Sequence, residues 1–183
     1  CAPWYSQRDS IKTIKVEKGI TTIGNEAFYD CYCASSVELP DSLEIISHSS
    51  FSGCSSLTSL VIPYGVNEIE FSAFENCTKL NSISIPDSVI KIGSDVFKNT
   101  AYYNNPNNWK NDILFIGNSL IDANRNISGD CVIPNGVRII AECAFSSCWG
   151  ITTVDIPNSV ESIGPSAFTD CNSLKTVTIN GSI

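Results

Sequence analysis

The stretch LTSLVIPYGVNEIEFSAFENC, residues 57–77, decides the fold because its pattern returns along most of the chain. Its Phe74 has counterparts at equal intervals, apart from one interval between Phe97 and Phe145 that holds a full period and an insertion. The phenylalanines of this column, called the Phe column below, are Phe28, Phe51, Phe74, Phe97, Phe145 and Phe168. Self-similarity at a fixed period of 23 residues predicts a repeat architecture.

Other apolar columns keep the same period. Ile69, Val66 and Ile62 stand five, eight and twelve residues before Phe74, and their counterparts in the other copies are all apolar. The apolar residues alternate up to Ile62, as in a short half-buried strand, and Pro63 then ends the strand because it lacks an N–H. The pattern predicts seven strands, beginning near Ile14, Val37, Leu60, Ile83, Cys131, Val154 and Val177.

One copy of the repeat is too small to bury its apolar columns alone. The copies must therefore stack, like residue on like residue, into a solenoid with one continuous core. We predict a single domain over residues 1–183, with repeats at 11–99 and 127–183. The five-residue step from Ile69 to Phe74 is too short for an independent helix, so it predicts a turn followed by a short extended or 3₁₀ piece on the convex side.

The period is lost in an insertion at about residues 100–126, which is rich in Asn, Tyr and Trp. Within it, two apolar runs flank Gly117 and Asn118, a pattern that predicts a β-hairpin projecting from the stack. Two interpretations of its aromatic residues stay open: they pack the hairpin against the repeats, or they form an exposed binding hot spot. These residues are Tyr102, Tyr103, Trp109 and Phe115.

The spacing of most of the nine cysteines matches the repeat period, which argues against a disulfide framework. Five stand three residues after a phenylalanine of the Phe column, and Cys131 stands in a strand column, so we expect these six to be buried thiols. Disulfides between adjacent copies stay possible. The five are Cys31, Cys54, Cys77, Cys148 and Cys171. The spacing of Cys31 and Cys33 is too tight for a usual zinc site, so no metal is expected.

Charge and composition disfavour several functions. A net charge of −8 disfavours nucleic acid and anionic membranes as partners, and no apolar run is long enough to span a bilayer. The chain has a single histidine, His48, whose repeat position carries no consistent chemistry, and its carboxylates form no recurring pair. A phosphate-binding glycine motif is also absent from the sequence. We therefore expect neither an enzyme nor a bound cofactor.

The strand residues between core positions should face the concave side of the solenoid. They are mostly Ser and Thr, and no Trp, Tyr or Arg stands among them to anchor an interface. Two interpretations stay open: these residues only solvate the sheet, or they make a weak, extended contact with a protein or glycan. The candidates for such a contact are Ser59, Val61, Ser82, Ser84, Thr153 and Asp155, besides the aromatic residues of the insertion.

Segments such as IPDSVIKIGSDVFKN (residues 85–99) and IPNSVESIGPSAFTDC (residues 156–171) resemble the leucine-rich repeat of BspA-type bacterial surface proteins. The resemblance implies an α/β-type, right-handed solenoid with parallel strands on its concave face, export, and attachment to a cell surface. It also implies binding to host or matrix macromolecules. We therefore expect a non-enzymatic, extracellular adhesion module, monomeric and without a nucleic-acid partner. The alternative is a purely structural spacer within a larger surface protein.

Overall fold

The computed structural model describes residues 2–181, which form two compact units. The first unit holds residues 2–89 and 93–106, and the second holds residues 90–92 and 107–181. The interpretation of residues 1–183 as one domain stays a prediction.

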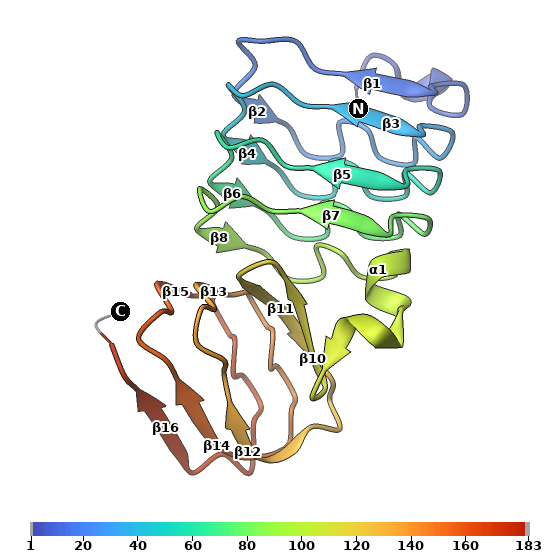
Figure 1. Ribbon diagram of the computed structural model, residues 1–183. Coiled ribbons are helices and arrows are strands. Elements are labelled where there is room, and N and C mark those ends of the chain that lie inside the picture. Colours follow the sequence, from blue (N-terminus) through green and yellow to red (C-terminus); the bar gives the residue numbers. More distant parts are fainter. Residues whose placement is uncertain (1, 182–183) are drawn as a thin grey trace. The chain divides into compact units, whose positions relative to one another are not determined.

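Parallel strands, one in each coil, build the first unit (Figure 1). Within each strand the middle residue points inward, as where Leu60 is buried between exposed Ser59 and Val61. Paired residues are one repeat apart, so Leu60 pairs with Ile83. The strands are β1 (Thr13–Lys15) with β3 (Ser36–Glu38), and β5 (Ser59–Val61) with β7 (Ser82–Ser84). Opposite them run the two-residue strands β2 (Thr22–Ile23), β4 (Ile45–Ile46) and β6 (Glu68–Ile69).

The segment around each phenylalanine of the Phe column is a run of turns. Ser72 and Asn76, two residues before and after Phe74, both have positive φ, at 54° and 61°. The N–H groups of Ser72, Phe74 and Asn76 donate to carbonyls of the following coil at 2.9–3.0 Å. The predicted order of a turn followed by a short extended or 3₁₀ piece is therefore wrong. The extended residues, such as β6, come before the turn, and the turn itself is neither extended nor 3₁₀.

Stacked aromatic rings fill the core of the first unit. The ring centroids of Phe28 and Phe51 are 5.2 Å apart, those of Phe51 and Phe74 are 5.2 Å apart, and those of Phe74 and Phe97 are 5.8 Å apart. Trp4 stacks on Phe28 at 5.3 Å, and its Nε1 donates to the carbonyl of Ala27 at 2.8 Å. Trp4, which directly precedes the 3₁₀ turn η1 (Tyr5–Gln7), thus covers the first ring of the stack.

The second unit contains two sheets. Three parallel strands, β12 (Ser128–Val132), β14 (Gly150–Ile156) and β16 (Thr176–Ile179), form one of them. The other sheet has the order β15, β13, β11, β10, β9. Its members are β9 (Trp109–Lys110), β10 (Ile113–Ile116), β11 (Ser119–Ala123), β13 (Ile139–Ile140) and β15 (Ser162–Ile163), and β8 (Lys91–Ile92) also belongs to this unit.

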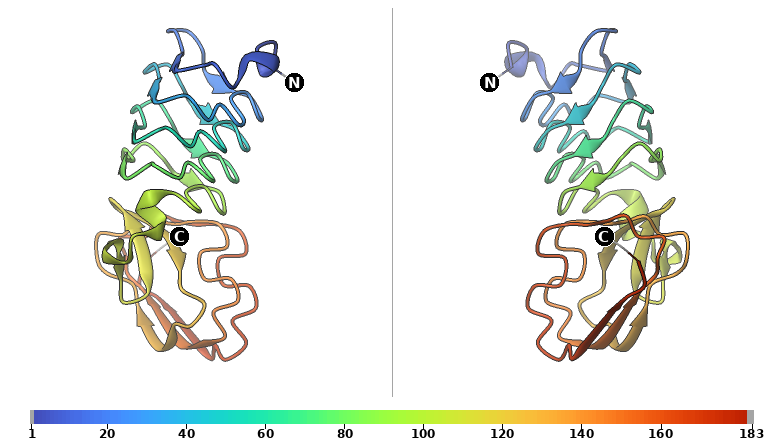
Figure 2. Two further views of the ribbon diagram at one scale, coloured as in Figure 1. Left: turned by 90° about the vertical axis from the view of Figure 1, so that its right-hand side faces the viewer. Right: turned by 90° about the vertical axis from the view of Figure 1, so that its left-hand side faces the viewer.

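The seven predicted strands are β1, β3, β5, β7, β12, β14 and β16, so this part of the prediction is confirmed. The α/β label overstates the helix content of the described residues. Their only helical segments are α1 (Ala101–Asn104) and the 3₁₀ turns η1 and η2 (Pro106–Asn108), because the turns between strands are too short for a helix. Figure 2 shows the coils of the first unit edge-on, as stacked loops.

The predicted projection of the hairpin is wrong. Strands β10 and β11 are antiparallel and joined by Gly117 and Asn118, but β11 also pairs in parallel with β13, with Leu120 opposite Ile140. The physical reason is that both strands bury apolar side chains, including Leu114 and Leu120, and therefore need cover on both faces.

Candidate functional site

Four predicted site residues of the first unit form one exposed group, called the sheet row below: Ser59, Val61, Ser82 and Ser84. The strand register places Ser59 opposite Ser82 and Val61 opposite Ser84. Val61 is 72% exposed, which is high for an apolar residue in a strand. The sheet row is thus a small, flat and uncharged surface with one apolar side chain at its edge.

The other two predicted strand residues, Thr153 and Asp155, lie on β14 of the second unit. Thr153 Oγ1 donates to Asp130 Oδ1 at 2.8 Å, and Asn180 Nδ2 donates to Asp155 Oδ1 at 2.6 Å. Both side chains are half-buried, so they are less accessible than the sheet row.

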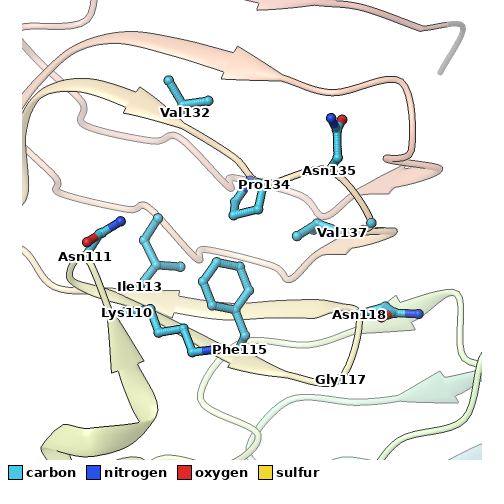
Figure 3. Close-up of a pocket in the computed structure, with 11 residues that line it drawn as sticks. Lys110, Asn111, Ile113, Phe115, Gly117, Asn118, Val132, Pro134, Asn135 and Val137 are labelled. Carbon is cyan, nitrogen blue, oxygen red and sulfur yellow. The ribbon is translucent and has the colours of Figure 1, made fainter.

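A hollow of about 330 Å³, called the Phe115 groove, opens on the second unit between the β9–β10 corner and the turn that follows β12. In Figure 3 the Phe115 ring points from β10 toward Pro134 and Val137, while Asn111, Asn118 and Asn135 lie around the rim. Its lining residues are Lys110, Asn111, Ile113, Phe115, Gly117, Asn118, Val132, Pro134, Asn135, Gly136 and Val137. The groove combines an apolar floor, a rim of amides and one cationic residue.

A second hollow, of about 400 Å³, adjoins the Phe115 groove and is called the Asp155 hollow. The two share Val132, Pro134 and Asn135. The rest of its lining is more polar and consists of Ile133, Asp155, Pro157, Asn158 and Asn180. Val132 is 68% exposed and forms part of both walls.

The predicted aromatic residues of the insertion do not form one cluster within either unit. Tyr102 and Tyr103 lie in α1 of the first unit, whereas Trp109 lies in β9 of the second. All three are half-buried, and burial raises the pKa of the Tyr102 hydroxyl. Each ring therefore combines packing with some exposed surface, and their role in binding stays a prediction.

The cysteines that follow the Phe column form a ladder of thiols. Three of the Sγ atoms donate to a main-chain carbonyl of the preceding coil: Cys54 to Phe28 at 3.4 Å, Cys77 to Phe51 at 3.3 Å, and Cys171 to Phe145 at 3.1 Å. Cys31, Cys54, Cys77, Cys131 and Cys148 are buried free thiols, as predicted, while Cys171, in the last coil, is half-buried. Burial raises the pKa of the Cys77 thiol to about 12 and those of Cys131 and Cys148 to about 11.

We expect native protein at pH 8 to resist alkylation of Cys54 and Cys77 by iodoacetamide, because the reactive thiolate is disfavoured and both sulfurs are buried. Half-exposed Cys33 serves as the internal control and should react first. Above the ordinary thiol pKa of 9.0, the unfolded chain loses protons that native Cys77 keeps, so the free energy of unfolding should fall with rising pH. Mass spectrometry after timed alkylation checks the first expectation, and rapid labelling of Cys77 at pH 8 would contradict it.

His48 is held in a structural arrangement. Its ring stacks on Phe71 with centroids 5.1 Å apart, and its Nδ1 lies 3.2 Å from the carbonyl oxygen of Phe71. The hydroxyl of the neighbouring Ser49 lies 3.4 Å from both ring nitrogens, which is longer than the contact of a nucleophile with its base. Among residues 2–181 no group of three or more His, Cys, Asp or Glu is placed to hold a metal ion.

None of the helices within residues 2–181 is long and apolar enough to cross a membrane.

The Phe115 groove was not predicted from the sequence. One signal was available, because Val132 and Val61, each thirteen residues before its phenylalanine, are apolar at a repeat position that holds Lys15, Glu38, Ser84 and Asp155 in the other copies. The wall that faces Val132 and the turn at Pro134 comes from the insertion, which has no counterpart in the other copies. Trp149 was also overlooked as an exposed aromatic residue, and it is 59% exposed.

Comparison with known proteins agrees with this architecture. The family model described as "BspA type Leucine rich repeat region" matches residues 4–128 and 115–183, with six copies. A leucine-rich repeat protein from Bacteroides ovatus is similar in structure, with 26% sequence identity over 93% of this chain and a TM-score of 0.54. The leucine-rich repeat protein of T. pallidum, TpLRR, has 26% identity over 91% of this chain and a TM-score of 0.51.

The chain spans 38% of the B. ovatus protein and 69% of the T. pallidum protein. No curated protein matches it. These two solved structures are leucine-rich repeat proteins, a family that is not generally enzymatic and that points to protein interaction. With its parallel-strand solenoid of about seven turns and a family model that covers nearly its whole length, the chain belongs to the BspA-type leucine-rich repeat family.

Proposed function

We propose that this chain is a non-enzymatic binding module at the cell surface or outside the cell, where it contacts host or matrix macromolecules as a monomer. Membership of the BspA-type family supports the location, and the sheet row supports the binding role. The observation that carries the proposal is the exposure of the sheet row, with Val61 at 72%. This surface offers small hydroxyls and one apolar group without a charge that would need to be desolvated.

The chemistry of the sheet row fits a weak contact. Ser59, Ser82 and Ser84 each bring one hydroxyl that donates and accepts hydrogen bonds, but none buries a large area. Strong interfaces depend on Trp, Tyr or Arg anchors, which the sheet row lacks. Useful affinity would therefore come from several such surfaces acting together in a longer protein.

A change confined to the sheet row tests the proposal. S59K/S82E adds bulk while keeping the net charge, and the two new charges attract each other because these residues are directly opposite. T21K/T78E is the matched control, since Thr21 and Thr78 are exposed elsewhere in the same unit. We expect the purified wild-type chain, displayed at high density, to bind at least one of collagen, fibronectin, laminin or an arrayed glycan. S59K/S82E should weaken this binding at least fivefold, and T21K/T78E should not.

The second candidate function is a structural spacer that holds other domains away from the cell. The side chain of Thr153 favours it, because its hydroxyl already donates to Asp130 within the unit. Replacing the chain by an unrelated solenoid of equal length separates the two functions. Unchanged adhesion of cells after this replacement would contradict the binding proposal.

A further inference from the structure

We propose that the Phe115 groove and the Asp155 hollow together bind an extended peptide segment that carries an apolar side chain close to a basic one. This inference rests on the proposed binding function and names a ligand class and a second surface for it. The two hollows share a wall formed by Val132, Pro134 and Asn135, so one ligand reaches both.

The Phe115 groove suits a single apolar side chain. Its floor is formed by Phe115 and Ile113 from β10, and Pro134 and Val137 face them from the turn after β12 (Figure 3). A volume of about 330 Å³ is at the lower end for small-molecule sites, and the groove is open to solvent. A ligand that inserts one side chain and lies across the rim uses this shape better than a fully enclosed small molecule.

The rim favours a peptide over a glycan. Asn111 and Asn135 bring side-chain amides, which carry both a donor and an acceptor and so match the N–H and C=O groups of an extended main chain. A sugar ring often stacks on a broad exposed aromatic face, whereas half-buried Phe115 lies beside aliphatic neighbours and offers no such face.

Charge complementarity selects the second side chain. The residues that line the Asp155 hollow include one carboxylate, that of Asp155, and no cation. Asn180 Nδ2 donates to Asp155 Oδ1 at 2.6 Å and so holds the carboxylate in place. The chain as a whole carries a net charge of −8, which further favours a basic partner.

The probes are fluorescent octapeptides in a glycine-serine background. Each carries one Leu and one Arg, separated by zero, one or two residues. Three spacings are tested because the position of the ligand on the shared wall sets the distance between the side chains that enter the two hollows. Control peptides replace Leu by Ser, or Arg by Glu. We expect at least one spacing to bind the wild-type chain in fluorescence polarisation, and either replacement to weaken binding about tenfold.

The chain offers a matched pair of variants. Val132 and Val61 have the same repeat position and similar exposure, 68% and 72%, but only Val132 lines the two hollows. We expect V132N to weaken peptide binding at least fivefold and V61N to leave it unchanged. D155N should weaken only the peptides that contain Arg.

These outcomes separate the two proposals. Failure of all three spacings, or equal effects of V132N and V61N, overturns the peptide inference while the matrix-binding test of the sheet row still stands. Binding of an arrayed glycan that V132N abolishes would also overturn it, because the occupant would then be a sugar. If the wild-type chain binds the peptides but none of the matrix proteins or glycans, only the proposed role of the sheet row is contradicted.

Discussion

Phe74→Ala is expected to lower the free energy of unfolding by about 3–5 kcal/mol. The Phe74 ring is fully buried and lies between two other rings, with centroids 5.2 Å from Phe51 and 5.8 Å from Phe97. Removing it loses the buried apolar area, leaves a cavity and breaks both stacking contacts. Neighbouring coils cannot close the gap, because the N–H groups of Phe74 and Asn76 remain bonded to the next coil. Urea unfolding followed by circular dichroism measures the change.

The matched control for this variant is Phe71→Ala, three residues earlier in the same coil. Phe71 is 44% exposed, and its ring contacts the ring of His48 at 5.1 Å. We expect a cost below about 1 kcal/mol, because a half-exposed ring leaves no closed cavity when it is removed. Equal losses for the two variants would contradict the assignment of Phe74 to the core and of Phe71 to the surface.

The strand order was predictable because burial repeats. Each coil must place an apolar side chain on the one before it, so positions such as Leu60 and Ile83 keep the same chemistry at the same interval. The turns around the Phe column were not predictable from residue type. Glu26 and Cys143 adopt positive φ, at 55° and 58°, although neither residue type favours it. Main-chain hydrogen bonds between coils impose this conformation, and the type of a single residue does not reveal such bonds.

The candidate site was predictable only in part, for a related reason. Exposure of the sheet row follows from strand alternation, which the sequence displays directly. The Phe115 groove depends instead on how the β10–β11 hairpin meets the turn at Pro134. The hairpin is present in one copy only, so no repeated residue pattern allows its contacts to be predicted. Val132 and Val61 show the difference, because their columns are the same and only their neighbours differ.

Gly93→Ala should be the second severe substitution, with a loss of about 2–3 kcal/mol. Gly93 stands four residues before Phe97, and a Cβ added to it would lie 2.5 Å from the amide nitrogen of Phe71 and 2.8 Å from the carbonyl carbon of Glu70. Both neighbours are main chain, so no side chain is able to rotate away. The N–H of Gly93 also donates to the carbonyl of Ile69 at 2.8 Å, which fixes the approach of the two coils.

Gly24→Ala is the control that isolates this cause. Gly24 has the same repeat position, four residues before Phe28, but a Cβ there would meet no atom within 4 Å. The substitution should be neutral or stabilise by up to about 0.5 kcal/mol, because alanine reduces the entropy of the unfolded chain. Ser47 and Glu70 occupy this position in other coils, so the position as such accepts side chains. A similar loss of stability in both variants would therefore mean that glycine is needed for its own conformation, whereas a loss confined to Gly93→Ala assigns the cost to the close contact between coils.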